Sequence, residues 1–326
     1  MCPVVDAGRQ PMWRFLTRAV LTLVCAASAV LAAPAAVQAA SVTLHMSPTG
    51  SDSADGGAGA PVRSLTRVKS LLAGSTATTA TVVVGAGTYY ETAMVSWSGV
   101  PQDLLLFRRE GTQRPVFDGS RVTGTTRYWM NTAGGPRLDV RELTVRNYRT
   151  GALRLDTSGN TVRNMIFERI GNKYVPDGSG FAAVHLLGSD DNAIVNNIMR
   201  DLENTDCPGC VHGVYAATGS SRNLLRGNTF SRVTGDPVRL RNGTDDNLVE
   251  DNTFTDSGLP GTDRALITFW RFTAAETCGT GNRAVGNTYD GRFHTGASGQ
   301  RIIGSGAEDG LAKCSSALTG SGNVLS

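Results

Sequence analysis

The sequence predicts an all-β fold in which the chain winds into a solenoid of stacked coils, a parallel β-helix. Five segments repeat one pattern: Asn after a turn residue, aliphatic residues, a second Asn and a final apolar residue. Their opening asparagines are 32, 31, 24 and 35 residues apart, a spacing typical of solenoids. The strands between them are short and aliphatic, without helical segments for βαβ crossovers. The repeated segments are 159–167, 191–199, 222–230, 246–254 and 281–289.

The asparagines of this repeat are expected to be scaffold and not catalytic. Asn tolerates the left-handed backbone conformation at a turn. Identical amides stacked in successive coils can also hydrogen-bond from coil to coil. We therefore expect a ladder formed by Asn160, Asn192, Asn223, Asn247 and Asn282.

The chain opens with an expected signal peptide over residues 1–39, followed by one β-helix domain over residues 40–326. Arginines precede an apolar run, and small residues suited to cleavage follow it. A membrane anchor is the alternative, but the run is short for a span and no basic stop-transfer segment follows. We expect a secreted, extracellular protein without a membrane span after signal removal. The signal features are Arg9, Arg14, Arg18, the run 19–33 and Val37-Gln38-Ala39.

The first part of the domain is expected to contain a strand and a short N-terminal capping helix. Residues 41–68 contain a strand, a Gly/Asp/Ser loop and an amphipathic helix. The helical spacing of its leucines and valine would direct one apolar face onto the end of the core. These residues are Leu65, Val68, Leu71 and Leu72; further strands are expected within 81–91, 103–109 and 115–120, and 138–147 is a degenerate repeat.

Four segments of this first part have a recognisable sequence: SPTGSDSADG (47–56), APVRSLTRV (60–68), VVVGAGTYYE (82–91) and PVFDG (115–119). Together with the Asn repeats, they resemble secreted proteins of the pectate-lyase-like superfamily. The resemblance implies a right-handed, single-stranded parallel β-helix over most of the mature chain. It does not define an activity, because lyases, hydrolases, epimerases and phage tailspikes share the fold.

The charge distribution argues against a nucleic-acid partner. The formal net charge is +3, and three arginines against one aspartate in the signal account for +2 of it. The remaining part has a charge of about +1, little Lys and no basic run. We expect a monomer that binds no nucleic acid.

Four cysteines remain after signal removal, an even number for an oxidising compartment. We expect the disulfides Cys207–Cys210 and Cys278–Cys314. Zinc is the alternative for Cys207-Pro-Gly-Cys210, but the sequence has no second CxxC or His pair at ligand spacing.

A second strand lies between successive Asn segments, and period-2 alternation assigns its faces. Each strand has two inward aliphatic residues and one outward residue between them. Coils are separated by about 4.8 Å, so the outward residues should form a ladder of roughly 15 Å, suited to a few sugar units. The outward ladder holds Arg154, His185, Tyr215, Arg239 and Thr268; the inward rows are Leu153, Val184, Val214, Val238 and Ile267, and Leu155, Leu186, Ala216, Leu240 and Phe269.

The residue types of the ladder suit cleavage of an acidic, uronate-containing polysaccharide by β-elimination. This reaction needs a cation to neutralise the sugar carboxylate and a base to remove the adjacent proton. Arginine binds carboxylates in bidentate fashion, and His and Tyr transfer protons near neutral pH. We therefore predict a polysaccharide lyase, with a uronate C5-epimerase as an alternative. The predicted catalytic residues are His185, Tyr215, Arg239 and His212.

Long polar loops beside these strands are expected to form the walls of a binding groove. They cover residues 171–181, 201–212 and 257–264. The predicted substrate-binding residues in and near these loops and strands are Arg154, Lys173, Asp236, Arg264 and Trp270, whereas His45 and His294 are expected to be structural.

Two other functions remain open on the same face. A glycoside hydrolase needs two carboxylates across the groove. Asn204-Thr205-Asp206 and His212-Gly213 resemble pieces of polygalacturonase-type motifs, but they are too close together, and Asp245-Asp246 follows them instead of preceding His-Gly. No roles are therefore transferred. The other alternative is a non-catalytic glycan-binding or adhesin-like surface protein; the acids near the ladder are Asp177, Glu203, Asp206 and Asp236.

The sequence predicts no certain cofactor and no metal-ligating residue. Several lyases of the superfamily use calcium, and Asp side chains are suitable oxygen ligands. Each candidate Asp lies in a turn beside Gly, Ser or Asn, where local hydrogen bonding is expected. Calcium therefore stays an alternative, with Asp52, Asp55, Asp190, Asp191, Asp245 and Asp246 as candidates.

Overall fold

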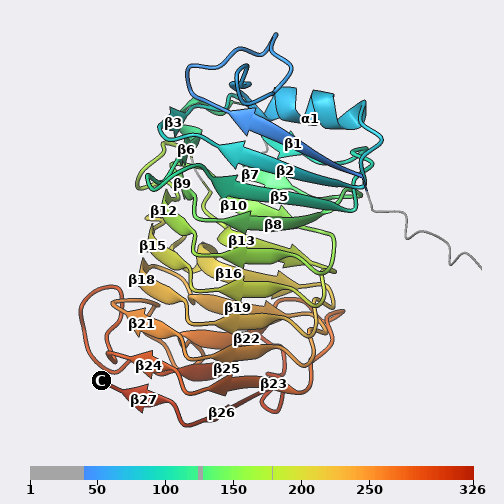
Figure 1. The fold of residues 1–326 in the computed structure, drawn as a ribbon. Coiled ribbons are helices and arrows are strands. Elements are labelled where there is room, and N and C mark those ends of the chain that lie inside the picture. Colours follow the sequence, from blue (N-terminus) through green and yellow to red (C-terminus); the bar gives the residue numbers. More distant parts are fainter. Residues whose placement is uncertain (1–39, 124–127, 178) are drawn as a thin grey trace, which may run out of the picture. The chain divides into compact units, whose positions relative to one another are not determined.

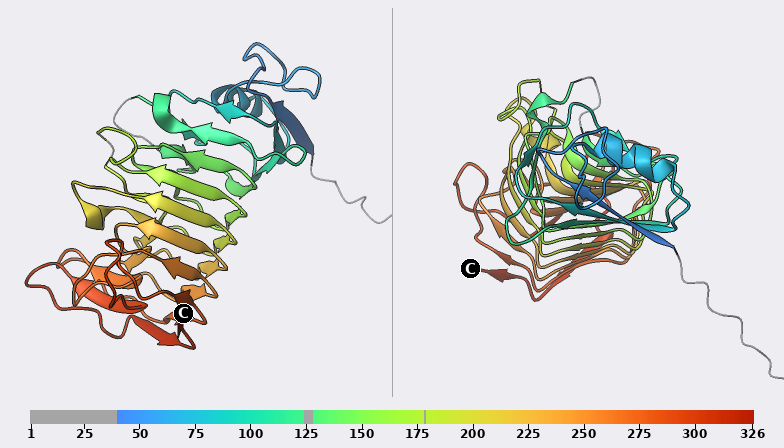
Figure 2. Two further views of the ribbon diagram at one scale, coloured as in Figure 1. Left: turned by 90° about the vertical axis from the view of Figure 1, so that its left-hand side faces the viewer. Right: turned by 45° about the horizontal axis from the view of Figure 1, so that its top comes forward.

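The computed structural model describes residues 40–123, 128–177 and 179–326. The expected signal peptide at residues 1–39 lies outside this part of the chain. From Ser41 onward the chain winds through three parallel sheets, and a full coil contributes one strand to each (Figures 1 and 2). The β-helix predicted from the sequence is confirmed.

The first sheet has ten strands, which mark ten successive coils. In pairing order they are β1 (Ser41–Met46), β2 (Thr79–Val84), β5 (Leu104–Arg109), β8 (Arg137–Arg141), β11 (Thr161–Arg163), β14 (Ala193–Val195), β17 (Leu224–Arg226), β20 (Leu248–Glu250), β23 (Asn282–Val285) and β26 (Leu318–Ser321).

The other two sheets complete the coils. The second sheet contains β4 (Val95–Ser96), β7 (Tyr128–Asn131), β10 (Gly151–Leu155), β13 (Ala182–Leu187), β16 (His212–Ala217), β19 (Val238–Arg241), β22 (Ile267–Arg271) and β25 (Ile303–Ala307). The third contains β3 (Thr88–Tyr89), β6 (Val116–Asp118), β9 (Thr144–Arg146), β12 (Ile166–Ile170), β15 (Ile198–Leu202), β18 (Thr229–Val233), β21 (Thr253–Thr255), β24 (Thr288–Tyr289) and β27 (Val324–Leu325).

The helix α1 (Leu65–Ala73) lies across the N-terminal end of the stack (Figure 2). Its N-cap, Ser64, accepts a 3.1 Å hydrogen bond from the backbone N–H of Arg67, which satisfies one of the free donors at the helix start. Leu65, Val68 and Leu72 are buried in the core, as their spacing predicts. Short 3-10 helices lie at Gly119–Arg121 and Pro208–Cys210.

Two ladders of buried asparagines join the coils, and the predicted ladder is one of them. The side-chain amide of each Asn donates to the amide oxygen of the Asn in the next coil, at 2.7–2.9 Å from Asn160 to Asn282. The second ladder, at 2.9–3.0 Å, uses the later Asn of each repeat and runs from Asn197 to Asn323. Each amide thus replaces its lost water contacts with bonds to the neighbouring coil.

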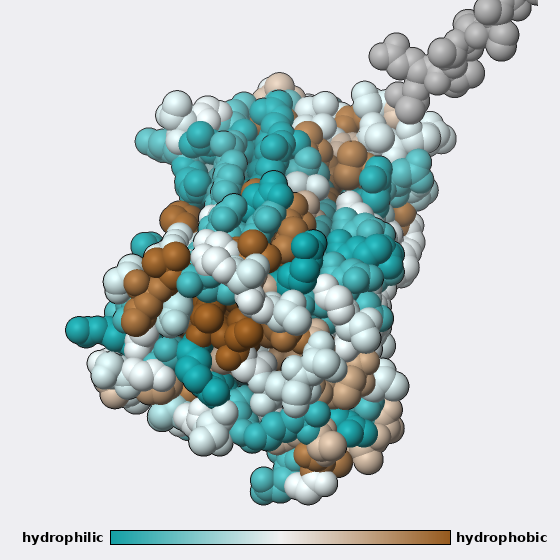
Figure 3. Space-filling view, turned by 90° about the horizontal axis from the view of Figure 1, so that it is seen from below, coloured by the Kyte–Doolittle hydropathy of each residue, from teal (hydrophilic) through white to brown (hydrophobic). Residues whose placement is uncertain are grey.

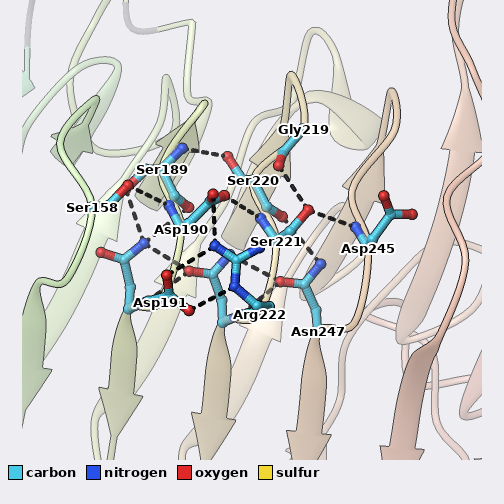
Figure 4. A network of polar contacts seen from close by, with 12 residues as sticks. Ser158, Ser189, Asp190, Asp191, Gly219, Ser220, Ser221, Arg222, Asp245 and Asn247 are labelled. Atoms are coloured by element: carbon cyan, nitrogen blue, oxygen red, sulfur yellow. Dashed lines mark hydrogen bonds and ion pairs between the residues drawn. The ribbon is translucent and has the colours of Figure 1, made fainter.

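The left-handed residues of these turns are not the ladder asparagines, contrary to our expectation. They directly precede the ladder: Asp191 before Asn192, for example, has φ 57°. The same turns carry a surface network, in which Arg222 bonds Asp191 and the backbone N–H of Asp245 bonds Ser221 (Figure 4). The ladder asparagines themselves have φ values outside the left-handed region.

Both expected disulfides are present, Cys207–Cys210 and Cys278–Cys314. Cys314 belongs to the core near the C-terminal end of the coils, so the second disulfide ties the last coils together. Seen from that end, apolar side chains reach the surface in patches bordered by polar ones (Figure 3).

Candidate functional site

The predicted ladder of outward residues is present in the second sheet. Parallel pairing places Arg154 beside His185, and His185 beside Tyr215. Arg239 follows beside Tyr215, with Thr268 beyond it. The two aliphatic rows are buried in the core, so alternation set the correct register for this part of each strand.

A β-bulge adds His212 to the same face. The N–H groups of Gly213 and Val214 both donate to the carbonyl of Pro237 at 2.9 Å. Both residues face inward, since a Cβ on Gly213 would lie 2.4 Å from a core aromatic ring and Val214 is a core residue. His212 and Tyr215 consequently share the outer face, with ring centroids 5.2 Å apart.

Three residues of the ladder are nearly buried, whereas the side chain of Arg154 is partly exposed. His185, Tyr215 and Arg239 are only 8%, 5% and 8% exposed. Phe181, from the long loop before β13, lies on them with its ring centroid 4.6 Å from His185 and 4.7 Å from Tyr215. The loop expected to form a wall therefore also forms a cover, and access is confined to pockets beside Phe181.

Two pockets open on this face and meet at Tyr215. The larger has a volume of about 940 Å³ and the smaller about 220 Å³. Phe181, Tyr215 and Arg241 line both, so a chain of sugars that occupied both pockets would pass over Tyr215. The larger pocket is also lined by His212, Arg239, Arg264, Phe272 and the Cys207–Cys210 disulfide, and the smaller by His185 and Glu276.

Asp236 organises the cations of the larger pocket. It is fully buried, and its Oδ2 accepts hydrogen bonds from Nε (3.1 Å) and Nη2 (2.6 Å) of Arg239. Its Oδ1 lies 3.8 Å from Nη1 of Arg264, and that Nη1 has no hydrogen-bond partner among the described residues. Asp236 therefore hydrogen-bonds Arg239, whereas it pairs with Arg264 only at the longer distance.

Trp270 supports these arginines from one side. The guanidinium carbons of Arg239 and Arg264 lie 4.8 and 5.0 Å from its ring centroid, and its indole N–H donates to Glu308 at 3.1 Å. Its side chain is almost completely buried. The expectation that Asp236 and Trp270 contact a sugar directly is therefore corrected: both lie behind the arginines and position them.

His212 is held as a neutral imidazole with a defined tautomer. Its Nδ1 lies 2.8 Å from the carbonyl oxygen of Asp236, and a carbonyl can only accept, so Nδ1 carries the proton. Burial, together with the charge of Arg239, lowers the pKa of His212 well below its usual range. The other ring nitrogen, Nε2, is therefore left unprotonated, as a general base requires.

Tyr215 is paired with a cation that the sequence analysis missed. Nη1 of Arg241 donates to its hydroxyl oxygen at 2.6 Å, and Arg241 also forms an ion pair with Glu276. Because a guanidinium can only donate, the hydroxyl oxygen of Tyr215 is the acceptor, and its O–H group is not used in this bond. Arg241 lies two residues after Arg239, so the alternation that defined the ladder would have placed it on the same face.

A model of the family described as "Right handed beta helix region" matches residues 129–305, more than half of the chain. The chain belongs to this family. A comparison with curated proteins found no match.

An alginate lyase and a rhamnogalacturonan lyase of solved structure share the β-helix fold. The chain aligns with an alginate lyase from Paenibacillus sp. str. FPU-7 at a TM-score of 0.52 and 14% identity. The alignment covers 87% of this chain and 95% of the alginate lyase. A rhamnogalacturonan lyase aligns at 0.50 and 16%, covering 76% and 68%. A pectate lyase, Pel9A, aligns at 0.45 and 12%, covering 89% and 80%. The right-handed parallel β-helix that the resemblance implied is confirmed.

Arg154 and Lys173 line neither of the two pockets at Tyr215. Nη2 of Arg154 lies 2.9 Å from Asp156 in the same strand region, and Nζ of Lys173 lies 2.5 Å from Glu203. Each cation is already neutralised by an adjacent carboxylate, which the sequence did not reveal. Their predicted roles as substrate contacts are not supported by this placement.

His185 faces the smaller pocket as a second neutral imidazole. Its Nδ1 lies 2.9 Å from the hydroxyl of Tyr128, and within the described ranges its buried Nε2 has no partner. Burial, with contributions from Arg154 and Arg241, lowers its pKa to about 3. Nε2 is therefore available for a hydrogen bond with a ligand in the smaller pocket.

Glu203, a candidate acid for a hydrolase, is instead the centre of a separate ion-pair cluster. It accepts hydrogen bonds from Lys173, Tyr174 and Arg232, and Nε2 of His294 lies 2.9 Å away. Burial opposes its ionisation, but these donors outweigh it and lower the pKa of Glu203. The carboxylates that line the larger pocket are Asp206 and Glu308.

The part of the chain that the structure describes contains neither a clustered metal site nor a membrane-spanning helix. No three His, Cys, Asp or Glu side chains are grouped there as a metal site. Of the calcium candidates, Asp190 and Asp245 accept backbone hydrogen bonds that join coils, from Ser221 and Thr280. No helix in the described part is long and apolar enough to cross a membrane.

Proposed function

We propose that the protein is a secreted lyase that cleaves an acidic, uronate-containing polysaccharide by β-elimination. One observation carries the proposal: a neutral His212 and a proton-bearing Tyr215 face the same pocket beside Arg264. This set supplies a base, an acid and a cation, which are the three groups that β-elimination needs. Lyases of known structure share this fold, but the proposal is argued from the residues of the site.

In the proposed reaction, the carboxylate of one uronate residue binds the guanidinium of Arg264, with Arg239 adjacent. This charge stabilises the electron density that develops when the C5–H bond breaks. Nε2 of His212 takes that proton, and the electron pair forms the C4–C5 double bond. The C4–O4 bond then breaks, and the hydroxyl of Tyr215 donates its proton to the leaving O4. Solvent returns the proton from His212 to Tyr215 after the products leave.

The position of Tyr215 agrees with a bond broken between two pockets. The larger pocket would hold the uronate that becomes unsaturated, and the smaller pocket its neighbour in the chain. His185, through its unpartnered Nε2, would bind a hydroxyl of that neighbour. The site as proposed uses no metal step, and calcium would enter only as an additional neutraliser.

Incubation of the mature protein with a panel of polyuronates tests the proposal. A lyase produces the ultraviolet absorbance of the conjugated double bond together with new chain ends. New reducing ends without this absorbance would indicate a hydrolase that uses Asp206 and Glu308. Changed uronate stereochemistry without cleavage would indicate a C5-epimerase, and binding without products an adhesin-like protein; each of these results would overturn the lyase.

A further inference from the structure

A separate cavity, of about 560 Å³, opens at the N-terminal end of the β-helix. The loop before α1 and the turn after β3 form its walls, and it shares no lining residue with the two pockets at Tyr215. Aromatic, acidic, basic and hydroxyl side chains meet there, including Tyr90, Arg121, Asp52, Glu91, Thr88 and Thr92.

Tyr90 gives this cavity an aromatic surface. Its side chain is 44% exposed, among the most exposed large apolar residues described. The guanidinium carbon of Arg121 lies over the ring at 4.0 Å and supports the ring from one side. Tyrosine in such a position combines an apolar face with a polar tip, as binding sites for amphipathic ligands require.

Glu91 is the polar anchor of the cavity. It lines the cavity and is 5% exposed, and its Oε1 accepts a 2.9 Å hydrogen bond from the N–H of Leu65 at the start of α1. Its other oxygen, Oε2, has no hydrogen-bond partner in the part of the chain that the structure describes. Burial raises the pKa of Glu91 to about 7, and the charge of Asp52 adds to this. Near neutral pH this carboxyl can therefore both donate and accept.

Asp52 repeats the arrangement beside it. Its Oδ1 accepts the N–H groups of Arg63 (3.1 Å) and Ser64 (2.9 Å). Its Oδ2 lies 3.9 Å from the guanidinium of Arg63, which is beyond hydrogen-bond distance. Each acid thus uses one oxygen to hold the start of α1 and keeps the other for a ligand.

The charges of the cavity select the class of ligand. Two arginines and two acids line the cavity, so it is not dominated by one sign of charge. An uncharged ring with several hydroxyl groups matches the acceptors, and its apolar face matches Tyr90. We propose that the cavity is a second carbohydrate site, which binds an uncharged glycosyl unit through Tyr90, Asp52 and Glu91.

Calorimetric titration of the full mature protein tests the site without measuring catalysis. The probes are neutral tetrasaccharides of galactose, arabinose, xylose and glucose, with trigalacturonate as the charged comparison. At least one neutral probe should bind, and Tyr90→Ala should weaken it about tenfold or more. Because Tyr90 is exposed, this variant should keep its fold; Glu91→Gln, which preserves shape, should also change the affinity.

Phe272→Ala is the matched control, because Phe272 is an exposed aromatic residue of the larger pocket. It should leave binding of the neutral probe unchanged. The site is disproved if no neutral probe binds, if Tyr90→Ala has no effect, if Phe272→Ala weakens binding instead, or if only trigalacturonate binds. None of these results depends on whether the protein is a lyase.

Discussion

Nη1 of Arg241 donates a hydrogen bond of 2.6 Å to the hydroxyl oxygen of Tyr215 across neighbouring strands. Glu276 holds Arg241 from the other side, so the position of the tyrosine oxygen is fixed from behind. The hydroxyl proton must then point elsewhere, and both pockets adjoin it. This relationship makes Tyr215 the most informative residue to alter.

Tyr215→Phe should lower kcat about 10²- to 10⁴-fold, because it removes the acid that protonates the leaving oxygen. KM should change little, since the ring remains. Steady-state measurement of unsaturated product on a polyuronate decides this. Tyr148→Phe is the control: Tyr148 is buried among core residues, and its hydroxyl has no partner among the described residues. Equal losses in both variants would contradict a specific role for Tyr215.

His212→Asn separates the proposed base from its structural hydrogen bond. The Asn amide can still donate to the carbonyl of Asp236, as Nδ1 of His212 does, but it has no basic nitrogen. The variant should keep its melting temperature and lose activity by about 10²-fold or more. If His212→Asn stays active while His212→Ala loses stability, the histidine is only structural.

The activity of the wild type should also persist as the pH falls from 7 to 6. Burial holds the pKa of His212 well below 6.5, so the base remains unprotonated across this range. A pH profile of kcat/KM measures this directly. A decline that follows an ordinary histidine titration near pH 6.5 would contradict the assigned state.

Arg264→Ala should reduce kcat/KM roughly 10- to 100-fold, because it removes the cation proposed to bind the carboxylate. Arg264→Lys should recover part of the loss, since the charge returns without the planar fork. Arg222→Ala is the control, because this exposed arginine pairs with Asp190 and Asp191 in the turns of Figure 4. A similar loss in this control would point to a general charge effect.

The buried His185 should make the fold less stable in acid. Its pKa is about 3 in the folded protein and about 6.5 when unfolded, so protons bind the unfolded chain preferentially. The stabilisation is complete above pH 6.5 and is lost as the pH falls toward 3; from 6.5 to 5 the loss is about 2 kcal/mol. Urea unfolding at several pH values should show that the free energy of unfolding falls more steeply with acid in the wild type than in His185→Gln. Glu91 has the opposite pH dependence, but it is present in both proteins, so its contribution cancels in the comparison.

Loss of one rung of an Asn ladder should be costly. Asn228 accepts from Asn197 and donates to Asn252 and to the carbonyl of Ile194. Asn228→Ala leaves these buried groups unpaired, at a cost of about 3 kcal/mol in the free energy of unfolding. Asn323→Ala, at the partly exposed end of the same ladder, should cost less. Equal costs would mean that burial of the rung is unimportant.

The repeat and the alternation predicted the scaffold because both depend on local rules. Stacked Asn residues and inward aliphatic rows follow from sequence spacing alone, and the register of Arg154, His185, Tyr215 and Arg239 followed from them. The bulge at Gly213 did not, because two inward residues in succession break the period of two. The only sequence signal for the bulge is the glycine, because a side chain at this position would clash with the ring of Phe230.

The ion-pair partner of each charged side chain, and its placement at a pocket or away from one, could not be predicted from the sequence. Arg154 and Arg239 are the same residue type in the same row, yet one lies outside the pockets with Asp156 and the other at a pocket with Asp236. Such pairings depend on loops whose path has no periodic pattern. The cover formed by Phe181 is another example, since a long polar loop predicts a wall but not which apolar residue it lays over the strands.

The pocket separates two tasks between different parts of the chain. Its floor consists of strands locked into the stack, which hold His212 and Tyr215, whereas its walls come from loops at 171–181, 201–212 and 257–264. Those loops can be exchanged without altering the register of the floor. A library that varies these three segments but keeps His212 and Arg264 would therefore be a direct route to new polysaccharide preferences on unchanged chemistry.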